Sequence, residues 1–408
     1  MGRAKKEWIE AQERGWSAPD THVCAHCLED LFLQQVVEDN VTEHACSYCE
    51  RTSSQPIAAP LDEVLPYIAG AFFQYYEEPG AAGLPRDSGE WVGEELITDT
   101  QDALLSLGTF ADGDLFEDIA NSFHDIAWVP APGGFWLGEH EHDRLIHAWG
   151  SFVKTTKHRS RYFFVKPMDP GSETGSTYSP QALLALIGQY IEEFSLWKEL
   201  FQDTVVYRAR KNTAASIGAE FSELCPPPPE LATAGRMNPP GISYGYFALD
   251  AETAVLEISD APPATYVLAT FSIRNRLLAV DLTGLPEIPS VFNIEMRRER
   301  DALIFLHSFV DAISLPVSKD GREHVEYVPS QIVCEYIAQV LRLGNDESPD
   351  AILYPSAVDP GHANLVVFPP RSYRDEWSDI VALVRASEVT ITTWNDYGSL
   401  ASRDGRIL

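Results

Sequence analysis

Long hydrophobic runs are missing from this sequence of 408 residues. It contains no stretch of 18 or more apolar residues, so no segment is suited to cross a bilayer as a helix. The first residues, Met1-Gly-Arg-Ala-Lys-Lys-Glu7, lack the apolar stretch that a secretory signal requires. We therefore expect a soluble, cytoplasmic protein with no membrane partner.

Basic residues are also scarce. Lysine and arginine number 30 against 61 aspartate and glutamate residues, which gives a formal net charge of -31 at pH 7. A surface this acidic repels phosphate backbones and anionic membranes at long range. Broad nucleic-acid binding is therefore disfavoured, and a well-solvated surface is the simplest reason for the charge.

Cysteine is limited to six residues, and without an export signal we expect no lasting disulfides. Four of the six form two pairs, Cys24-Ala-His-Cys27 and Cys46-Ser-Tyr-Cys49, at the spacing of a zinc ribbon or knuckle. Four thiolates leave no open position on the metal, so the pattern predicts a structural zinc ion. The alternative is two unrelated turns with buried free thiols.

The length of the chain favours more than one domain. We expect residues 1–60 to form the zinc-binding segment and residues 61–200 to form a helical domain. Ser179 and Pro180 supply a cap and a first-turn proline for one of its helices. Another helix is indicated by apolar residues at helical spacing, at Leu61, Val64, Leu65 and Ile68.

Strand patterns dominate after about residue 201, and we expect a third domain over residues 201–408. Ser330 is expected to cap a helix. Strands mixed with short helices make the expected fold class α+β. Runs rich in β-branched and aromatic residues predict strands at residues 204–210, 266–273, 277–281 and 364–368.

Residues 235–241, Gly-Arg-Met-Asn-Pro-Pro-Gly, form a turn-rich loop that presents Arg236. A predicted strand with Tyr244 and Tyr246 follows, and then a short helix that carries Glu257 among apolar neighbours. A carboxylate in such a setting is unusual unless it is exposed, paired or functional.

Four segments between residues 205 and 368 resemble, in order, the RES-domain family. They are Tyr207-Arg208-Ala-Arg210, the run at 235–241, Tyr246 with Glu257 eleven positions on, and Ile352-Leu-Tyr-Pro-Ser356. The resemblance implies an ADP-ribosyltransferase-like mixed β domain. It also implies an enzyme that degrades NAD by phosphorolysis or hydrolysis, usually a toxin restrained by an antitoxin or another regulatory protein.

The resemblance further implies roles for the matched residues. Arg208 and Arg236 would hold the phosphates of NAD, since a guanidinium matches an anionic oxygen pair. Tyr246 would contact the nicotinamide end, and Ser356 would hold a ribose or phosphate oxygen. Arg210, two residues beyond Arg208, is expected to face solvent or form a salt bridge if Arg208 binds substrate.

Glu257 is the residue that we expect to be catalytic, because a fixed carboxylate beside the ribose would stabilise positive charge as nicotinamide leaves. Asn238 either contacts substrate or only shapes its turn. Outside the family resemblance, Glu257 would be an ordinary surface glutamate. No glutamate-x-glutamate pair follows residue 201, which by analogy favours water or inorganic phosphate as the acceptor.

The helical part resembles the HEPN-related module that precedes some RES domains, through the paired cysteines, Trp149 and the basic strip at 157–164. HEPN ribonucleases space an arginine and a histidine four to six residues apart, which Arg144 and His147 do not match. Two alternatives stay open. The cationic and aromatic residues at 147–164 would suit RNA binding, or the chain is a non-catalytic interaction protein.

Overall fold

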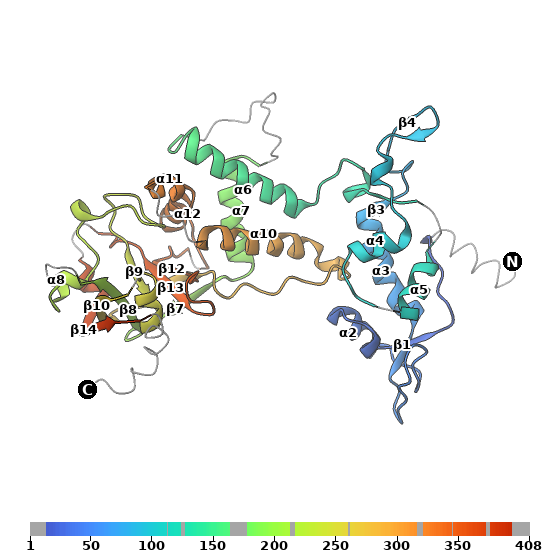
Figure 1. The fold of residues 1–408 in the computed structure, drawn as a ribbon, viewed down its shortest axis with the longest axis horizontal. Helices are drawn as coiled ribbons and strands as arrows, with labels where there is room; N and C mark the ends of the chain where they lie inside the picture. Colours follow the sequence, from blue (N-terminus) through green and yellow to red (C-terminus); the bar gives the residue numbers. More distant parts are fainter. Residues whose placement is uncertain are drawn as a thin grey trace. The chain divides into compact units, whose positions relative to one another are not determined.

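The computed structural model describes residues 14–111, 113–123, 127–163, 178–212, 217–259, 262–315, 321–344, 346–372 and 376–393 (Figure 1). Residues 1–7, which were searched for a secretory signal, and Phe164 of the basic strip lie outside these ranges. The chain divides into two compact units. Unit 1 comprises Met1–Arg144 and Glu287–Ile304, and unit 2 comprises Leu145–Pro286 and Phe305–Leu408.

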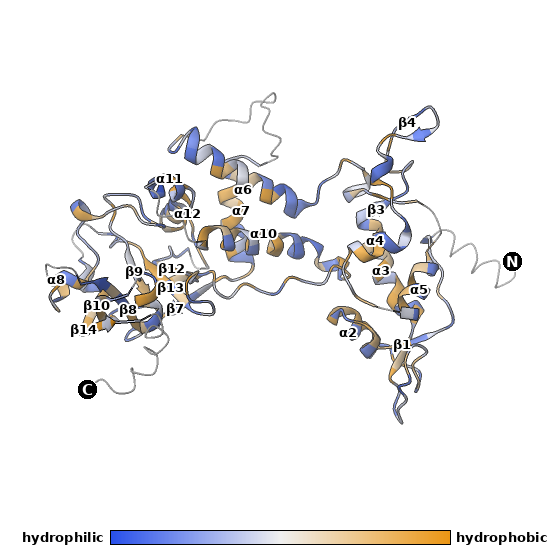
Figure 2. Cartoon of the chain, in the orientation of Figure 1, coloured by the Kyte–Doolittle hydropathy of each residue, from blue (hydrophilic) through white to orange (hydrophobic). Residues whose placement is uncertain are grey.

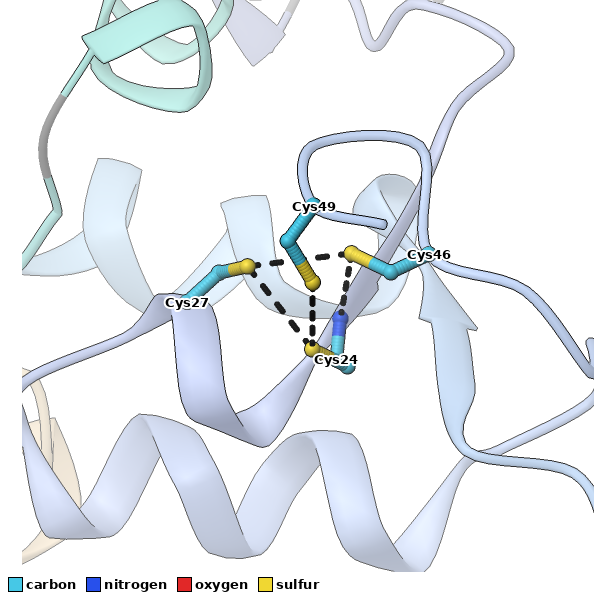
Figure 3. A group of neighbouring side chains, drawn as sticks. All are labelled: Cys24, Cys27, Cys46 and Cys49. Carbon is cyan, nitrogen blue, oxygen red and sulfur yellow. Dashed lines mark hydrogen bonds between the residues drawn. The ribbon is translucent and has the colours of Figure 1, made fainter. Parts of the chain in front are cut away.

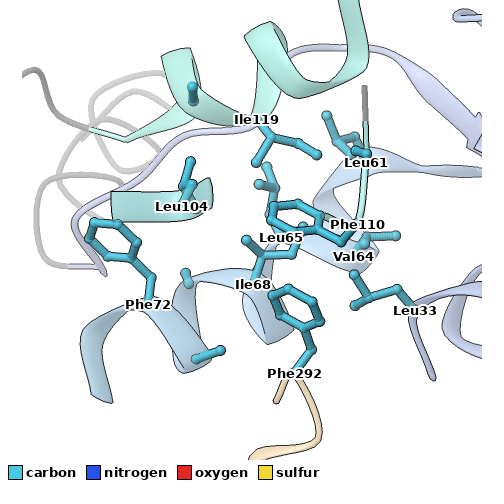
Figure 4. Packing of buried hydrophobic residues seen from close by; sticks show 14 of the residues in the cluster. Leu33, Leu61, Val64, Leu65, Ile68, Phe72, Leu104, Phe110, Ile119 and Phe292 are labelled. Carbon is cyan, nitrogen blue, oxygen red and sulfur yellow. The ribbon is translucent and has the colours of Figure 1, made fainter. Parts of the chain in front are cut away.

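Unit 1 is built around helix α3 (Leu61–Tyr75), as the apolar spacing predicted. The helix is drawn mostly in the orange of hydrophobic residues (Figure 2). Leu61, Val64, Leu65 and Ile68 are fully buried along it. Phe292, from the later segment of this unit, packs edge to face against Phe110 at 4.8 Å between ring centroids (Figure 4). Unit 1 therefore closes its core with residues that come from two distant parts of the sequence.

Short strands and helices surround that core. Strands β1 (His22–Cys24) and β2 (Ala58–Pro60) pair antiparallel, and Asp30 caps α2 (Leu31–Asp39) by accepting a bond from the backbone N of Leu33. The remaining elements of unit 1 are η1 (Ala25–Cys27), β3 (Tyr76–Glu77), β4 (Arg86–Asp87), β5 (Glu90–Trp91), η2 (Glu94–Leu96), α4 (Thr100–Ser106), α5 (Gly113–Ser122), β6 (Val129–Pro130), η3 (Pro132–Gly134) and η5 (Ile294–Met296).

Two long helices cross a boundary between the units along the chain, α6 (Glu141–His158) and α10 (Arg297–Ser314). Within unit 2, Ser179 caps α7 (Pro180–Glu193) by accepting a bond from the backbone N of Ala182 at 3.1 Å, as predicted. The expected cap at Ser330 is wrong. Helix α12 begins two residues earlier (Val328–Gln339) and places Pro329 in its first turn, so Ser330 lies inside the helix.

Unit 2 is organised by an eight-stranded sheet in the order β14-β10-β8-β9-β13-β12-β11-β7. Strands β11 and β12 run parallel, and the other neighbouring pairs run antiparallel. The four predicted strands correspond to β8 (Val205–Lys211), β10 (Ala264–Ile273), β11 (Leu277–Asp281) and β13 (Ala363–Val367). The other strands are β7 (Trp197–Leu200), β9 (Gly245–Ala248), β12 (Ala351–Pro355) and β14 (Val381–Ile391).

The two faces of this sheet have different coverings. One face carries a large core that includes Val206, Phe247 and Leu365. The opposite face is covered by α9 (Ala251–Leu256), which packs with Ala209 and Ala248. The short helices α8 (Phe221–Leu224), η4 (Pro229–Leu231), α11 (Glu323–Glu326) and α13 (Trp377–Ile380) complete unit 2.

The fold is therefore of mixed α+β class, with a helical N-terminal region and a large mixed sheet, as the sequence indicated. Among the residues described, no helix has both the length and the apolar character needed to span a bilayer. The expected division at residues 60 and 200 stays a prediction, because compactness alone does not define evolutionary domains.

Candidate functional site

The four paired cysteines meet at one point in unit 1 (Figure 3). The sulfur of Cys24 lies 3.7 Å from those of Cys27 and Cys49, and the sulfur of Cys27 lies 3.7 Å from that of Cys46. A disulfide would need about 2.05 Å. Four sulfurs at about 2.3 Å from a tetrahedral zinc ion would be about 3.8 Å apart. The group therefore fits a metal ion, and the alternative of two unrelated turns is wrong.

The surroundings of these sulfurs also suit thiolate ligands. Burial alone would raise the pKa of Cys46, but bonds from the backbone N–H groups of Tyr48 and Cys24, each at 3.4 Å, outweigh burial and lower that pKa to about 7. Burial raises the pKa of Cys24 and Cys27, so their thiolates need a positive charge beside them. A divalent cation would supply that charge.

In unit 2, Glu257 and Ser356 are in direct contact. Glu257 follows the last residue of α9, and Ser356 follows β12, so each stands at the end of a rigid element. The hydroxyl of Ser356, which is 5% exposed, donates to Oε1 of Glu257 at 2.8 Å. Glu257 itself is an exposed residue, and a buried hydroxyl holds one oxygen of its carboxylate.

A third residue, Asn364, joins this pair, and the sequence analysis did not identify it. Its Nδ2 donates to the same Oε1 of Glu257 at 2.5 Å. Asn364 lies at the centre of the sheet, opposite Ala248 of β9 and Tyr354 of β12. The only signal in the sequence was a polar residue that opens an otherwise apolar strand.

The loop at 235–241 is held by a buried amide. Asn238, 3% exposed, donates from Nδ2 to the carbonyl oxygens of Thr233, Pro239 and Ile242. Its Oδ1 accepts a bond from the hydroxyl of Tyr246 at 2.8 Å, and that hydroxyl accepts from the backbone N of Met237 at 3.0 Å. These bonds support the reading of Asn238 as a turn-shaping residue.

Tyr354 is a further buried residue beside Asn364. Tyr354 pairs with Asn364 across β12 and β13, so the two side chains share one face of the sheet. Asn364 also pairs with Ala248 of β9, and Tyr246 lies two residues before Ala248, so it shares that face too. Burial, with Tyr246 and Glu257 as neighbouring charges when ionised, raises the pKa of Tyr354 well above its usual value. The structure thus brings Tyr246, Glu257 and Ser356 to one face, around a tyrosine that the sequence analysis missed.

Arg208 leaves β8 on the opposite face, since it alternates with Tyr207, which pairs with Ala248. Its Nη1 donates to the backbone oxygen of Tyr246 at 3.0 Å. Strands β8 and β9 share only one described residue pair, Tyr207 with Ala248, and diverge beyond it. The guanidinium of Arg208 therefore bonds the carbonyl of Tyr246 at the point where the two strands separate. Burial lowers the pKa of Arg208 to about 10, and Arg210 adds to the effect.

Arg210 shares the face of Arg208, because residues two apart on a strand point the same way. Its side chain is half-buried and donates to the backbone oxygen of Glu223, so the two arginines are not divided between the two faces.

Arg236 bonds the C-terminal end of α10. Its Nη1 donates to the carbonyl oxygens of Ile313, at 3.0 Å, and Leu315, at 2.5 Å, at the C-terminus of α10.

The loop after β12 is tied to the start of α9 beside the Glu257 pair. The hydroxyl of Thr253 lies 2.7 Å from Oδ2 of Asp250 and 2.5 Å from Oδ2 of Asp359. The backbone N of Asp359 donates to Oγ of Ser356 at 3.1 Å, and His362 lies 3.2 Å from Asp359. Ser356 therefore has a structural role in its loop as well as its contact with Glu257.

The cationic and aromatic residues at 147–163 do not form one surface. Trp149 stacks on Phe152 and packs edge to face on Phe309, and Lys157 pairs with Glu326 at 2.5 Å. Beyond the end of α6, by contrast, Tyr162 and Phe163 are 84% and 86% exposed. The part of this segment that lies on α6 is thus structural, as the pairing of Lys157 with Glu326 indicates. The residues after α6 face solvent.

Comparison with known families agrees with this architecture. A family model described as the HEPN/RES N-terminal domain 1 matches residues 39–170, and the RES domain model matches residues 205–385. No curated protein matches the chain significantly. The first match includes Cys46 and Cys49, and the second runs from β8 into the first half of β14 and includes Glu257 and Ser356. The resemblance predicted from the sequence is confirmed, and the chain joins a HEPN/RES N-terminal domain to a RES domain.

Proposed function

We propose that this protein breaks the bond between nicotinamide and ribose in NAD, with Glu257 as the catalytic carboxylate. RES domains are generally enzymes that act on NAD, often as toxins, and the match covers the whole proposed site. The observation that carries the proposal is the bond from Ser356 to Glu257, which fixes one carboxylate oxygen on the face that also holds Tyr246 and Tyr354.

The reaction follows from the charge that develops on the sugar. When the bond between the ribose C1 and the nicotinamide nitrogen breaks, its electron pair leaves with neutral nicotinamide, and C1 becomes positively charged. The carboxylate of Glu257, held near the ribose hydroxyls, stabilises this charge. An oxygen of water or inorganic phosphate then bonds to C1, and a proton is released in the case of water.

The other matched residues are proposed to hold the substrate. Tyr246 would contact the nicotinamide end, Ser356 a ribose oxygen, and Arg208 and Arg236 the phosphates. Because Arg208 leaves β8 on the other face of the sheet, it would reach the phosphates where β8 and β9 diverge. The described bonds of Arg208 and Arg236 to carbonyl oxygens use only Nη1 of each guanidinium, which leaves Nη2 for an anion. Asn238 would act by keeping the 235–241 loop in shape.

We further propose that zinc is the metal for Cys24, Cys27, Cys46 and Cys49. The ion would stabilise unit 1 and take no part in the reaction, because four sulfur ligands leave no position for water. The three parts at residues 1–60, 61–200 and 201–408 would then be a zinc-binding segment, a helical regulatory domain and the catalytic domain. An antitoxin or another regulatory protein in the cell would restrain such an activity.

Incubation of the purified full chain with NAD tests the proposal, in buffer with and without inorganic phosphate. Release of nicotinamide is the expected result. ADP-ribose would identify water as the acceptor, and its phosphorylated counterpart would identify phosphate. NAD that stays intact under both conditions would contradict the proposal.

RNA binding is a second candidate function, and the exposed residues at 159–163 of the basic strip favour it. Arg159, Arg161, Tyr162 and Phe163 are all exposed, and arginines beside aromatic rings suit stacking against single-stranded bases. Fluorescence anisotropy with a single-stranded RNA at low salt would show binding that Tyr162→Ala with Phe163→Ala weakens. Equal anisotropy with and without protein would exclude this function.

A further inference from the structure

Asn364 is a polar residue in an apolar setting. It lies in β13, between β9 and β12, and it is only 3% exposed, while its strand neighbours Leu365 and Val366 are fully buried. A buried amide without partners costs free energy, so an amide at this position needs bonds that offset its burial. The bond that its Nδ2 makes is the one to Oε1 of Glu257, at 2.5 Å.

Two donors therefore converge on one oxygen of Glu257. Ser356 donates to Oε1 from the end of β12, and Asn364 donates to the same atom from β13. An exposed glutamate side chain otherwise samples several rotamers, and ordering it costs conformational entropy. Two bonds to Oε1 restrict the orientation of the carboxylate, and both donors described for Glu257 bond this oxygen rather than Oε2.

We propose that Asn364 is a positioning residue for Glu257, one that sets the orientation of its carboxylate so that Oε2 meets the ribose of the substrate. This role rests on the proposed cleavage of NAD. Asn364 does not touch the substrate itself. It acts through Glu257, by keeping the charge in place before the ribose becomes positive, so that no reorganisation is needed during the reaction.

Asn364 is a cleaner subject for a test than Ser356. Ser356 also accepts a bond from the backbone N of Asp359, so its replacement would disturb the loop after β12. The backbone of Asn364 is instead paired on both sides, with Ala248 and with Tyr354. Removing its amide group should leave the strand in place and free the glutamate.

The test is a double-mutant cycle on the full chain with Asn364→Leu and Glu257→Gln, measured by nicotinamide release from NAD. Alone, Asn364→Leu should lower kcat about 10- to 100-fold and change KM by less than about twofold. In the Glu257→Gln background, the same change should have almost no further effect, because Asn364 acts through the carboxylate. Thr156→Val, another buried polar position, is the matched control and should keep wild-type kcat.

Three results would overturn the proposal. Asn364→Leu with wild-type kcat would show that the amide does not position Glu257. An equal loss in both backgrounds would show that Asn364 is structural only. A wild-type protein that leaves NAD intact would contradict both the proposed function and the role of Asn364. A wild type and an Asn364→Leu variant that are equally active would contradict the role of Asn364 alone. If Asn364→Leu does not fold, Asn364→Ser, whose hydroxyl is too short to reach Glu257, replaces it in the cycle.

Discussion

The hydroxyl of Ser356 donates to Oε1 of Glu257 at 2.8 Å, although the two residues lie 99 positions apart in the sequence. Each follows the end of a regular element that packs in the core, α9 for the glutamate and β12 for the serine. The backbone of each residue is thereby anchored, while Glu257 itself is an exposed residue. A group held in this way can meet a substrate without first being reordered.

Removal of the metal should destabilise unit 1. We expect the purified chain to contain about one zinc ion, and Cys46→Ser to lose it, because three ligands of a structural site bind far more weakly than four. Elemental analysis measures the ion, and thermal unfolding measures the loss of stability. Cys225→Ser is the matched control, since Cys225 lies in unit 2 and should change neither. A metal-free wild type with the same unfolding temperature before and after chelation would refute this.

Gly235 should not accept a side chain. A Cβ at this position would lie 2.5 Å from Oδ1 of Asn238 and 2.6 Å from the hydroxyl oxygen of Tyr246, and both atoms are held by bonds of their own. Gly235→Ala should therefore lower the free energy of unfolding by about 1–3 kcal/mol. Urea denaturation gives this value. Gly218→Ala, where the nearest atom is 3.7 Å away, should leave it nearly unchanged, and equal effects of the two would contradict the packing.

Stability should depend on pH through Asp281. Burial alone would raise its pKa, but bonds from Lys198 and Thr283 outweigh burial and lower it. Because the pKa of Asp281 is lower in the folded chain than in the unfolded chain, the ionised carboxylate stabilises the fold at any pH above the unfolded pKa, which is near 3.8. This stabilisation is lost as the pH falls through the pKa of the folded chain.

The difference in unfolding free energy between the wild type and Asp281→Asn should thus be constant above about pH 5 and shrink below about pH 4. Urea denaturation at pH 6, 4 and 3 measures it, with the exposed Asp20→Asn as a control. If the difference in unfolding free energy grew as the pH fell, the pKa of Asp281 would be raised by folding rather than lowered, which would contradict the prediction.

Much of the fold could be predicted from local patterns. The capped start of α7 and the strands β8, β10, β11 and β13 follow from the periodicity and turn chemistry of a few neighbouring residues. The start of α12 was missed, although Pro329 marked its first turn, because a serine cap and a first-turn proline compete as signals in adjacent positions.

The site was less accessible to prediction, because its contacts are non-local. In the sequence, nothing distinguishes Asn364 from other strand residues, because its partner Glu257 lies 107 positions away and only the fold places the two in contact. Arg208 and Arg236 could be matched to a family pattern, but only the structure shows that both bond backbone carbonyl oxygens. The paired cysteines were predicted correctly as a group, since the spacing within each pair alone limits how the sulfurs converge.

The most direct test of the account is the rate of nicotinamide release from NAD by the wild type and by Glu257→Gln at equal concentration and with equal folded content. Glutamine keeps the shape but not the charge, so we predict a loss of kcat of at least about 100-fold with little change in KM. Glu252→Gln, on helix α9 just before Glu257, should keep wild-type activity. A Glu257→Gln variant that cleaves NAD as fast as the wild type would contradict the central claim.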